Sequence, residues 1–194
     1  VLIPRMDTEL LVTTAKELLL GRKMDARILD LCCGSGCIAC ALGHELPATK
    51  LVAVDISANA LEIARENFAS NRLGSRAICI QADATSSPPM SIGQFDMIVS
   101  NPPYIASAEI MTLDASVRDY EPIWALDGGE DGYRFYKAII KYWKSLLRPG
   151  GFLLFEVGEG QAATVKEMLS SAGFRAVGSR LDTLNIERVV IGKM

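Results

Sequence analysis

An apolar stretch of the sequence ends in an amide, two prolines and an aromatic ring. Residues 96–104 read D-M-I-V-S-N-P-P-Y. Each proline removes a backbone donor and fixes φ at about −65°, so the chain is stiff directly after Asn101. The Asn101 side-chain oxygen and the Pro102 carbonyl are acceptors that could take both hydrogens of a substrate NH2 group. Because neither is a strong base, the motif suits a planar amino nitrogen that needs orientation rather than deprotonation.

Such a nitrogen could attack an electrophilic methyl group. Two accepted hydrogen bonds orient the amino group and favour the positive charge that develops on its nitrogen. Tyr104 can stack on the planar group that carries the nitrogen. We therefore predict a catalytic motif made of Asn101, Pro102, Pro103 and Tyr104. The alternative is a proline-terminated turn without a chemical role.

A glycine-containing turn forms the second candidate site. Residues 30–36 read D-L-C-C-G-S-G, between an apolar stretch and a helical one. Backbone amides in such a turn can approach a ligand without obstruction by side chains. The turn fits the loose dinucleotide pattern G-x-G-x-x-G/A, so a nicotinamide enzyme is one possibility. It also approximates D-x-G-x-G-x-G, an opening that binds S-adenosylmethionine, with Cys32 in place of the first glycine.

Acidic residues stand at the ends of successive predicted strands. Asp30 lies toward the end of the first predicted strand, Asp55 at the end of the second and Asp83 at the end of the third. Ligands gather at the carboxyl ends of parallel strands. Asp55 would accept hydrogen bonds from ribose hydroxyls, and Asp83 would lie beside an adenine amino group with the Ala84 amide facing the ring. The alternative is that these acids cap the turns and helices that follow them.

The elements that must position these residues alternate between strands and helices. Helical spacing predicts a first helix over 7–20, ended by Gly21. The predicted strands cover 26–33, 50–56, 77–83, 95–101, 151–157, 176–182 and 187–194. Further helices are predicted at 37–46, after Ser57, at 132–147 and from about 159 to 172. This alternation indicates an α/β fold with a parallel sheet, and the last two strands should form an antiparallel hairpin.

Composition excludes several classes of protein. The chain has 194 residues, of which 49% are hydrophobic and 22% charged, which indicates one globular domain. The net charge of −3 disfavours nucleic acid as a direct partner. No apolar run reaches the roughly 20 residues that span a bilayer, and the first residues lack a secretory pattern. We therefore expect a cytoplasmic protein that does not contact membranes.

The five cysteines raise the question of a metal site. They are Cys32, Cys33, Cys37, Cys40 and Cys79. The spacing C-C-x3-C-x2-C differs from the paired C-x2-C of zinc sites, and His44 is the single histidine. The cysteines are therefore predicted to be small buried hydrophobic residues with reduced thiols, and no metal is expected.

The combination of motifs resembles the protein-(glutamine N5) methyltransferases that modify peptide-chain release factors, the HemK/PrmC type. The resemblance runs along essentially all 194 residues and includes I-L-D-L-C-C-G-S-G, V-D-I-S, S-N-P-P-Y-I and P-G-G-F-L-L-F-E-V-G-E-G-Q. It implies a Rossmann-like, class I S-adenosylmethionine-dependent methyltransferase with a seven-stranded, mostly parallel sheet in the order 3-2-1-4-5-7-6. The implied reaction moves a methyl group from S-adenosylmethionine to the glutamine of a release factor's G-G-Q tripeptide, leaving S-adenosylhomocysteine.

The resemblance also implies roles for individual residues. Asn101 through Tyr104 would bind the glutamine amide. The cofactor would be bound by Cys32, Cys33, Gly34, Ser35, Gly36, Asp55, Ile56, Asp83, Ala84 and Asn101. Arg5, Thr8 and Glu9 are expected near the methionine end of the cofactor, with Met6 where the family usually has a proline.

Family members also carry a helical N-terminal domain that helps recognise the release factor. Residues 1–194 are therefore expected to form a single catalytic domain without that upstream domain. A long segment, 102–131, interrupts the alternation of strands and helices, and loops of this length are usually functional. Its acidic residues could line a slot for the G-G-Q loop or could simply be solvated: Asp114, Asp119, Glu121, Asp127, Glu130 and Asp131.

Two further functions remain as alternatives. An amino methyltransferase that acts on adenine in nucleic acid would use the same N-P-P-Y chemistry, but it would need a base-flipping pocket and a phosphate-binding surface. A cofactor-binding subunit without activity would serve as an activator of a partner. The nicotinamide enzyme is less consistent, because no acid or base for hydride transfer stands out in the sequence.

Overall fold

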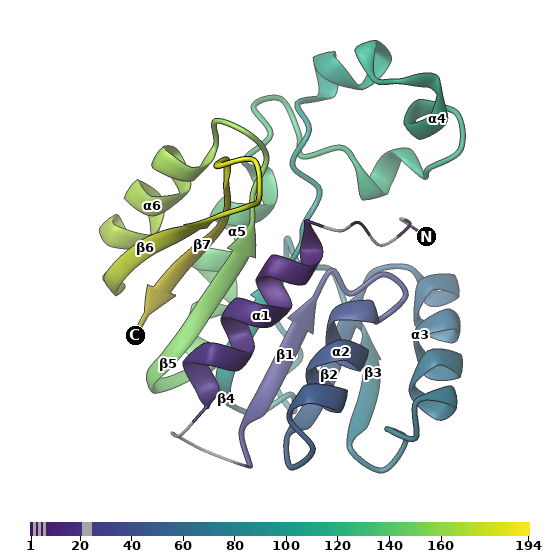
Figure 1. The fold of residues 1–194 in the computed structure, drawn as a ribbon, viewed down its shortest axis with the longest axis vertical. Helices are drawn as coiled ribbons and strands as arrows, with labels where there is room; N and C mark the ends of the chain where they lie inside the picture. Colours follow the sequence, from purple (N-terminus) through teal and green to yellow (C-terminus); the bar gives the residue numbers. More distant parts are fainter. Residues whose placement is uncertain (2, 4, 6, 21–24) are drawn as a thin grey trace.

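The computed structural model describes residues 1, 3, 5, 7–20 and 25–194 (Figure 1). Met6 and Gly21, which entered the sequence predictions, lie outside the described residues. In the described part of the chain, seven strands form one sheet in the order β3-β2-β1-β4-β5-β7-β6. The predicted α/β class and strand order are therefore confirmed.

The sheet is parallel except at its C-terminal edge. Its strands are β1 (Arg27–Leu31), β2 (Lys50–Asp55), β3 (Ala77–Gln81), β4 (Phe95–Ser100), β5 (Leu147–Glu156), β6 (Arg175–Leu181) and β7 (Glu187–Lys193). Strand β7 pairs antiparallel with both β5 and β6, as the predicted hairpin requires. In the register, Leu31 of β1 lies between Val54 of β2 and Ser100 of β4. The three central strands therefore end at the same edge of the sheet.

Helices cover both faces of the sheet (Figure 1). One face packs on α1 (Thr8–Leu19), α2 (Cys37–Glu45) and α3 (Ala58–Ser70), through a buried cluster that includes Leu11, Leu42 and Phe68. The other face packs on α5 (Arg134–Tyr142) and α6 (Ala162–Ser171), through Tyr136, Phe155 and Val165. Because central strands are buried on both faces, they read as continuous apolar runs. Among the described residues, no helix is long and apolar enough to cross a membrane.

Two predicted boundaries around β5 are wrong. The helix predicted over 132–147 ends at Tyr142 and is followed by a short 3-10 helix, η3 (Lys144–Leu146). Strand β5 begins at Leu147 rather than at residue 151, because the register of β4 and β5 shifts between Phe95 and Met97. This irregularity accommodates the turn-forming residues 148–151 within the strand. Helical spacing of apolar residues continues through this region, so the sequence pattern could not mark the change.

The segment 102–131 is also more structured than a loop. It contains η1 (Ser107–Thr112), α4 (Ala115–Arg118) and η2 (Ile123–Ala125). Residues 105–128, here called the projecting segment, extend away from the sheet near the label α4 (Figure 1). Its base is closed because the Ile105 amide donates to the Leu126 carbonyl at 3.0 Å and the Gly128 amide donates to the Ile105 carbonyl at 2.8 Å. These bonds fix where the segment leaves and rejoins the domain.

Candidate functional site

A cavity of about 370 Å³ opens where the carboxyl ends of the central strands meet the projecting segment. Its wall includes many of the residues singled out in the sequence: Cys32, Gly34, Asp55, Ile56, Asp83, Ala84, Asn101 and Pro103. The projecting segment contributes Trp124, Ala125 and Asp127. The structure therefore brings two of the three predicted strand-end acids, Asp55 and Asp83, and part of the N-P-P-Y motif to one cavity, whereas Asp30 is not among the described wall residues.

The turn after β1 has an unusual backbone. Cys32 has φ 61° and Gly34 has φ 54°, both in the left-handed region. Glycine occupies this region readily, whereas a residue with a Cβ is strained there. The D-x-G-x-G-x-G motif has its first glycine at this position. Cys32 thus keeps the left-handed backbone conformation that a glycine would favour there. The Gly34 amide donates to Asp55 Oδ2 at 2.8 Å, which ties this turn to the end of β2.

Asp55 holds two neighbouring turns together. Besides the Gly34 amide, its carboxylate accepts a hydrogen bond from the Ser57 amide, to Oδ1, at 2.9 Å. A carboxylate has about four acceptor positions. Two of them are used by these backbone donors, so the Asp55 side chain keeps capacity to accept from hydroxyl groups in the cavity that it lines.

Asp83 also caps the turn that follows its strand. Its Oδ1 accepts from the Thr85 amide and the Thr85 hydroxyl, each at 2.7 Å, and its Oδ2 accepts from Ser86 Oγ at 3.3 Å. Burial acts to raise the pKa of Asp83, but the hydrogen bonds from Thr85 and Ser86 outweigh it and hold the pKa below its ordinary value. Asp83 is therefore ionised at neutral pH and combines a capping role with a place on the cavity wall.

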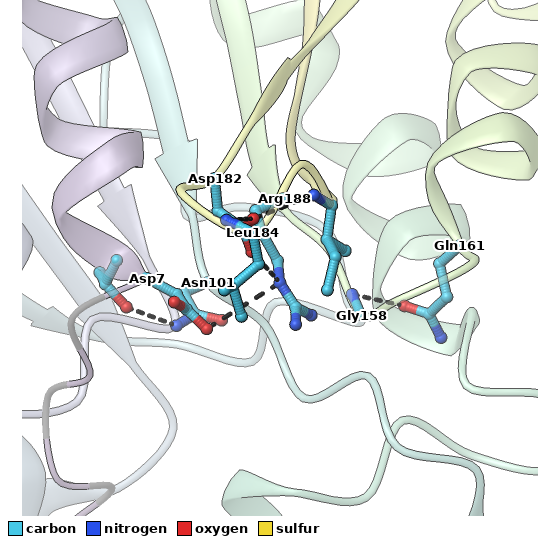
Figure 2. Close-up of polar contacts among 9 residues, drawn as sticks. Asp7, Asn101, Gly158, Gln161, Asp182, Leu184 and Arg188 are labelled. Carbon is cyan, nitrogen blue, oxygen red and sulfur yellow. Dashed lines mark hydrogen bonds and ion pairs between the residues drawn. The ribbon is translucent and has the colours of Figure 1, made fainter.

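Asn101 follows β4 and links the cavity to helix α1. Its Nδ2 donates to Thr8 Oγ1 at 3.3 Å. Beside it, Asp7 at the beginning of α1 pairs with Arg188 of β7, with Oδ2 and Nε separated by 3.9 Å (Figure 2). Thr8 is buried, with 7% of its surface exposed. One side of the Asn101 amide therefore contacts the protein interior, while the residue also lines the cavity.

The rest of the N-P-P-Y motif is held by the loop between β5 and α6. Pro102 and Pro103 are buried, and Tyr104 packs partly buried against the cluster under α5 and α6. Gln161 Nε2 donates to the Tyr104 carbonyl at 2.8 Å, and Gln161 Oε1 accepts from the Gly158 amide at 3.1 Å (Figure 2). Gln161 thus fixes the backbone of the motif from a distant part of the chain.

Comparison with known proteins identifies the family. A family model described as the methyltransferase small domain matches residues 6–117. The chain is 43% identical to the release factor glutamine methyltransferase of Geobacter sulfurreducens over 194 residues, covering 100% of this chain and 66% of that protein. It is 41% identical to the enzyme of the same name from Bordetella pertussis, covering 97% of this chain and 68% of that protein.

The chain belongs to the release factor glutamine methyltransferase family. It spans about two thirds of the length of these two relatives, and 57% of the enzyme of the same name from Bradyrhizobium diazoefficiens, to which it is 45% identical over 88% of its own length. Among solved structures, the hMettl16 catalytic domain in complex with the MAT2A 3'UTR hairpin 6 has a TM-score of 0.75 at 21% identity, covering 98% of this chain and 72% of that one. This likeness shows the methyltransferase fold.

Some residues that the family resemblance assigned to the cofactor do not belong to the described cavity wall. They are Cys33, Ser35 and Gly36. Cys33 is buried, the Ser35 carbonyl accepts from Asn67 Nδ2 at 2.9 Å, and a Cβ on Gly36 would lie 3.0 Å from the Phe68 ring. These residues shape the turn after β1. Pro102 and Tyr104 likewise lie outside the described wall, and the predicted roles of all five stay predictions.

Other wall residues were not anticipated from the sequence. Trp124, Arg134 and Phe135 come from the projecting segment and the beginning of α5. Nothing in their local pattern marks them, because their place depends on how the segment folds back over the sheet edge. Thr8 and Arg5 were expected near the site, and Thr8 does contact Asn101. Arg5 forms an ion pair with Glu121 of the projecting segment, with Nη2 and Oε1 separated by 3.2 Å, and its expected place near the cofactor stays a prediction.

The acidic residues of the long segment mostly have structural partners. Asp114 accepts from the Ser116 amide, Asp119 pairs with Arg118, and Asp131 accepts from the Tyr133 amide. Asp127 accepts from Ser107 Oγ at 2.7 Å and from the Gly129 amide at 2.9 Å. Of these acidic residues, Asp127 lines the cavity as far as the described residues show. A slot lined by the whole group therefore stays a prediction.

Two carboxyl groups of the central strands are buried. Asp30 of β1 is 1% exposed and Glu156 of β5 is 2% exposed. Asp30 Oδ2 accepts from the Ala39 amide at 3.0 Å, whereas its Oδ1 has no hydrogen-bond partner among the described residues. Burial raises the pKa of both carboxyl groups to about 7. The sequence predicted the position of Asp30 at a strand end but gave no signal for Glu156.

The cysteines show no arrangement for a metal ion. Within the described part of the chain, no group of three or more histidine, cysteine, aspartate or glutamate residues is placed to hold one. All five cysteines are free thiols. Burial raises the pKa of Cys37 and of Cys40 to about 11, so both thiols are protonated at neutral pH. Protonated thiols are poor metal ligands and weak nucleophiles.

Proposed function

We propose that this chain transfers a methyl group from S-adenosylmethionine to the side-chain amide nitrogen of a glutamine in a peptide-chain release factor. The proposal is supported by membership of the family and, most directly, by one cavity that joins Asp55 and Asp83 to Asn101. We also propose that residues 1–194 act as the catalytic domain and that the G-G-Q tripeptide carries the target glutamine.

The cavity has the chemistry that a nucleoside with a charged tail requires. Asp55 retains acceptor positions for ribose hydroxyls, and Gly34 exposes backbone beside it. Ile56 is 58% exposed on the wall and offers an apolar face to a flat ring, next to Asp83 and the buried Ala84. When bound, S-adenosylmethionine supplies an electrophilic methyl group. The residues present therefore fit this cofactor.

The N-P-P-Y motif would hold the target amide. Asn101 Oδ1 and the Pro102 carbonyl accept from the two hydrogens of the glutamine NH2 group, which fixes the direction of the nitrogen lone pair. The same two acceptors favour the positive charge that develops on the nitrogen as it is methylated. No general base is needed before the attack, because the proton can leave afterwards. Tyr104 would stack on the planar carboxamide.

The substrate would be an extended, glycine-rich loop. Glycines on both sides of the target glutamine lack side chains and therefore let the loop enter a narrow opening. In this structure the opening lies between the sheet edge and the projecting segment, which contributes Trp124 and Asp127. We propose that this segment contacts the release-factor loop.

The test is direct detection of the product. The chain is incubated with labelled S-adenosylmethionine and either a purified release factor or a peptide that contains G-G-Q, and tandem mass spectrometry locates the added group. We expect one methyl group on the glutamine side chain, and none when that glutamine is replaced by alanine. The peptide removes any dependence on other regions of a longer enzyme. Label on DNA or RNA, with none on the glutamine, would contradict the proposal.

A further inference from the structure

Glu156 lies beside Asn101 at the end of the neighbouring strand. In the register of β4 and β5, Ser100 pairs with Phe155, so the next residue of each strand comes side by side. Successive side chains of a strand point to opposite faces. Val99 and Leu154 both belong to the buried cluster under α1. Two residues further along, Asn101 and Glu156 therefore share the face that α1 covers, where Thr8 lies.

The Asn101 amide has two polar neighbours on this protein side, Thr8 and Glu156. Asn101 Nδ2 donates to Thr8 Oγ1 at 3.3 Å. Hydrogen bonds from the Thr8 and Asn101 side chains also stabilise the charged form of Glu156. An asparagine NH2 group has two hydrogens, and its carbonyl oxygen points in the opposite direction. With Nδ2 directed toward Thr8, the oxygen is left to face the cavity that Asn101 lines.

We propose that Glu156 is a positioning residue which, together with Thr8, determines which end of the Asn101 amide faces the substrate. The inference rests on the proposed function, in which Asn101 must present an acceptor to the NH2 group of glutamine. If the amide were reversed, two NH2 groups would face each other and no hydrogen bond between them could orient the nitrogen. Glu156 prevents this reversal because its carboxylate can only accept hydrogen bonds.

Protonation should weaken this control. Burial raises the pKa of Glu156 to about 7, and the charge of Asp7 adds to this rise. The rise is opposed by hydrogen bonds from Thr8 and Asn101 and by the charge of Arg188. Arg188 is itself paired with Asp182 at 3.1 Å and with Asp7 at 3.9 Å (Figure 2). The Tyr136 hydroxyl donates to the backbone carbonyl of Glu156 at 3.0 Å. Burial is the main cause that raises the pKa of Tyr104, and the charge of Glu156 raises it further.

Below a pH of about 7, therefore, Glu156 gains a proton that it can donate. A protonated carboxyl can donate to Asn101 Oδ1 and compete with the substrate for that acceptor. The methylation rate should then fall toward acidic pH, with a midpoint at the pKa of Glu156.

The first experiment compares Glu156→Gln with wild type on the G-G-Q peptide. Glutamine keeps the shape of glutamate but carries an NH2 group that can donate to Asn101 Oδ1. We expect kcat to fall by about tenfold, the equivalent of one hydrogen bond, with the KM for S-adenosylmethionine unchanged. The fall in kcat toward acidic pH that we expect for wild type should be absent in this variant. Glu167→Gln, the same change at an exposed position of α6, is the control and should behave as wild type.

A second pair of variants separates positioning from folding. Thr8→Ser keeps the hydroxyl that contacts Asn101, whereas Thr8→Val keeps the shape without it. We expect Thr8→Ser to retain most of the wild-type kcat and Thr8→Val to lose several-fold. Equal kcat values for these two variants, or a Glu156→Gln enzyme with the wild-type rate and pH profile, would overturn the inference. If Glu156→Gln does not fold, the threonine pair decides.

A third readout does not depend on catalysis. The side-chain NH2 resonances of Asn101, followed by nitrogen-15 NMR, should shift with a midpoint at a pH of about 7 in wild type and should not shift in Glu156→Gln. Absence of this titration in wild type would overturn the role of Glu156 whether or not the peptide is methylated. Conversely, a titration without methylation would count against the proposed function alone.

Discussion

Acidic residues occur in two regions of the molecule, the strand ends and the projecting segment, and their settings differ. At the strand ends, Asp30 and Glu156 are buried, each with one carboxylate oxygen that has no partner among the described residues, and burial raises the pKa of each to about 7. In the projecting segment, Asp114 and Asp119 accept hydrogen bonds from Ser116 and Arg118, which lower their pKa values.

The difference shows what decides whether a carboxyl group can respond to pH near neutrality. The central strands are covered by helices on both faces, and Asp30 and Glu156 lie where this cover removes their side chains from water. The projecting segment has little interior of its own, and its acids instead cap short helices or pair with neighbouring cations. The buried acids can therefore titrate near neutral pH, whereas the acids of the projecting segment stay ionised and support local structure.

The largest expected effect is the loss of the acceptor at Asn101. Asn101→Ala should lower kcat for methylation of the G-G-Q peptide by about 100-fold, as for removal of one preorganised group that stabilises developing charge. Steady-state kinetics with labelled cofactor measure this. Asn71→Ala, at an exposed position after α3, is the matched control and should keep the wild-type rate. An unchanged rate in Asn101→Ala would remove the central residue of the proposed site.

The second prediction concerns the stability contributed by the buried strand-end acid. Burial in the folded protein raises the pKa of Asp30 from 3.8 to about 7. The folded state therefore binds a proton at Asp30 more tightly than the unfolded chain does. The resulting contribution to stability is present at low pH and is lost as pH rises through about 7. Between about pH 5 and pH 8, the free energy of unfolding should fall on the order of 2 kcal/mol further in wild type than in Asp30→Asn.

Urea unfolding at a series of pH values measures this difference. Asp114→Asn serves as the contrasting variant, because the pKa of Asp114 is lowered, chiefly by hydrogen bonds from Ser116, and it should not flatten the curve in this range. Parallel stability curves for wild type and Asp30→Asn would show that Asp30 is not a buried titrating group, and the contrast between the two regions would be lost.

The third prediction asks which part of the projecting segment belongs to the site. Trp124 is 67% exposed and lines the cavity, whereas Tyr120 is 85% exposed and lies outside the described wall. Trp124→Ala should raise the dissociation constant for S-adenosylhomocysteine by about tenfold through lost ring contact, and Tyr120→Ala should leave it unchanged. Calorimetric titration measures both. Equal affinities of the two variants for S-adenosylhomocysteine would show that Trp124 does not contact the bound cofactor.

The smallest effect is expected for a capping acid. Asp114 accepts from the Ser116 amide at 2.8 Å and caps the short helix α4. Asp114→Ala should lower the melting temperature by no more than about 2 °C and leave kcat within about twofold of wild type. Thermal unfolding and the peptide assay test this. A large loss of activity in Asp114→Ala would indicate that Asp114 contacts the substrate. The acids of the projecting segment would then not be limited to a structural role.

The sequence predicts features that depend on local pattern or on strand order. Apolar runs that alternate with helical spacing give the parallel sheet, and parallel strands bring Asp55, Asp83 and Asn101 to one edge. The capping by Asp114 was not predicted, although it is a local contact with Ser116, two positions further along the chain. Contacts between distant parts of the chain are different. Thr8 and Asn101 are separated by 93 positions, and no local signal joins them.

The same reason explains why the burial of Glu156 was not predicted and why the boundaries near β5 are wrong. Burial of Glu156 depends on α1, β4 and β7 together, so an acidic residue at the end of an apolar strand gave no indication of its setting. The helical pattern before β5 continues past Tyr142, and the shift in register between β4 and β5 ends it instead. Tertiary packing overrides local pattern at both places.

The most direct measurement is a crystal structure of this chain with S-adenosylhomocysteine and a peptide that contains G-G-Q. We predict that the ribose hydroxyls contact Asp55 and that the glutamine nitrogen lies within hydrogen-bond distance of Asn101 Oδ1, with Asn101 Nδ2 still directed at Thr8. A nucleoside bound outside this cavity, or an Asn101 amide that presents its NH2 group to the glutamine, would contradict the central claim.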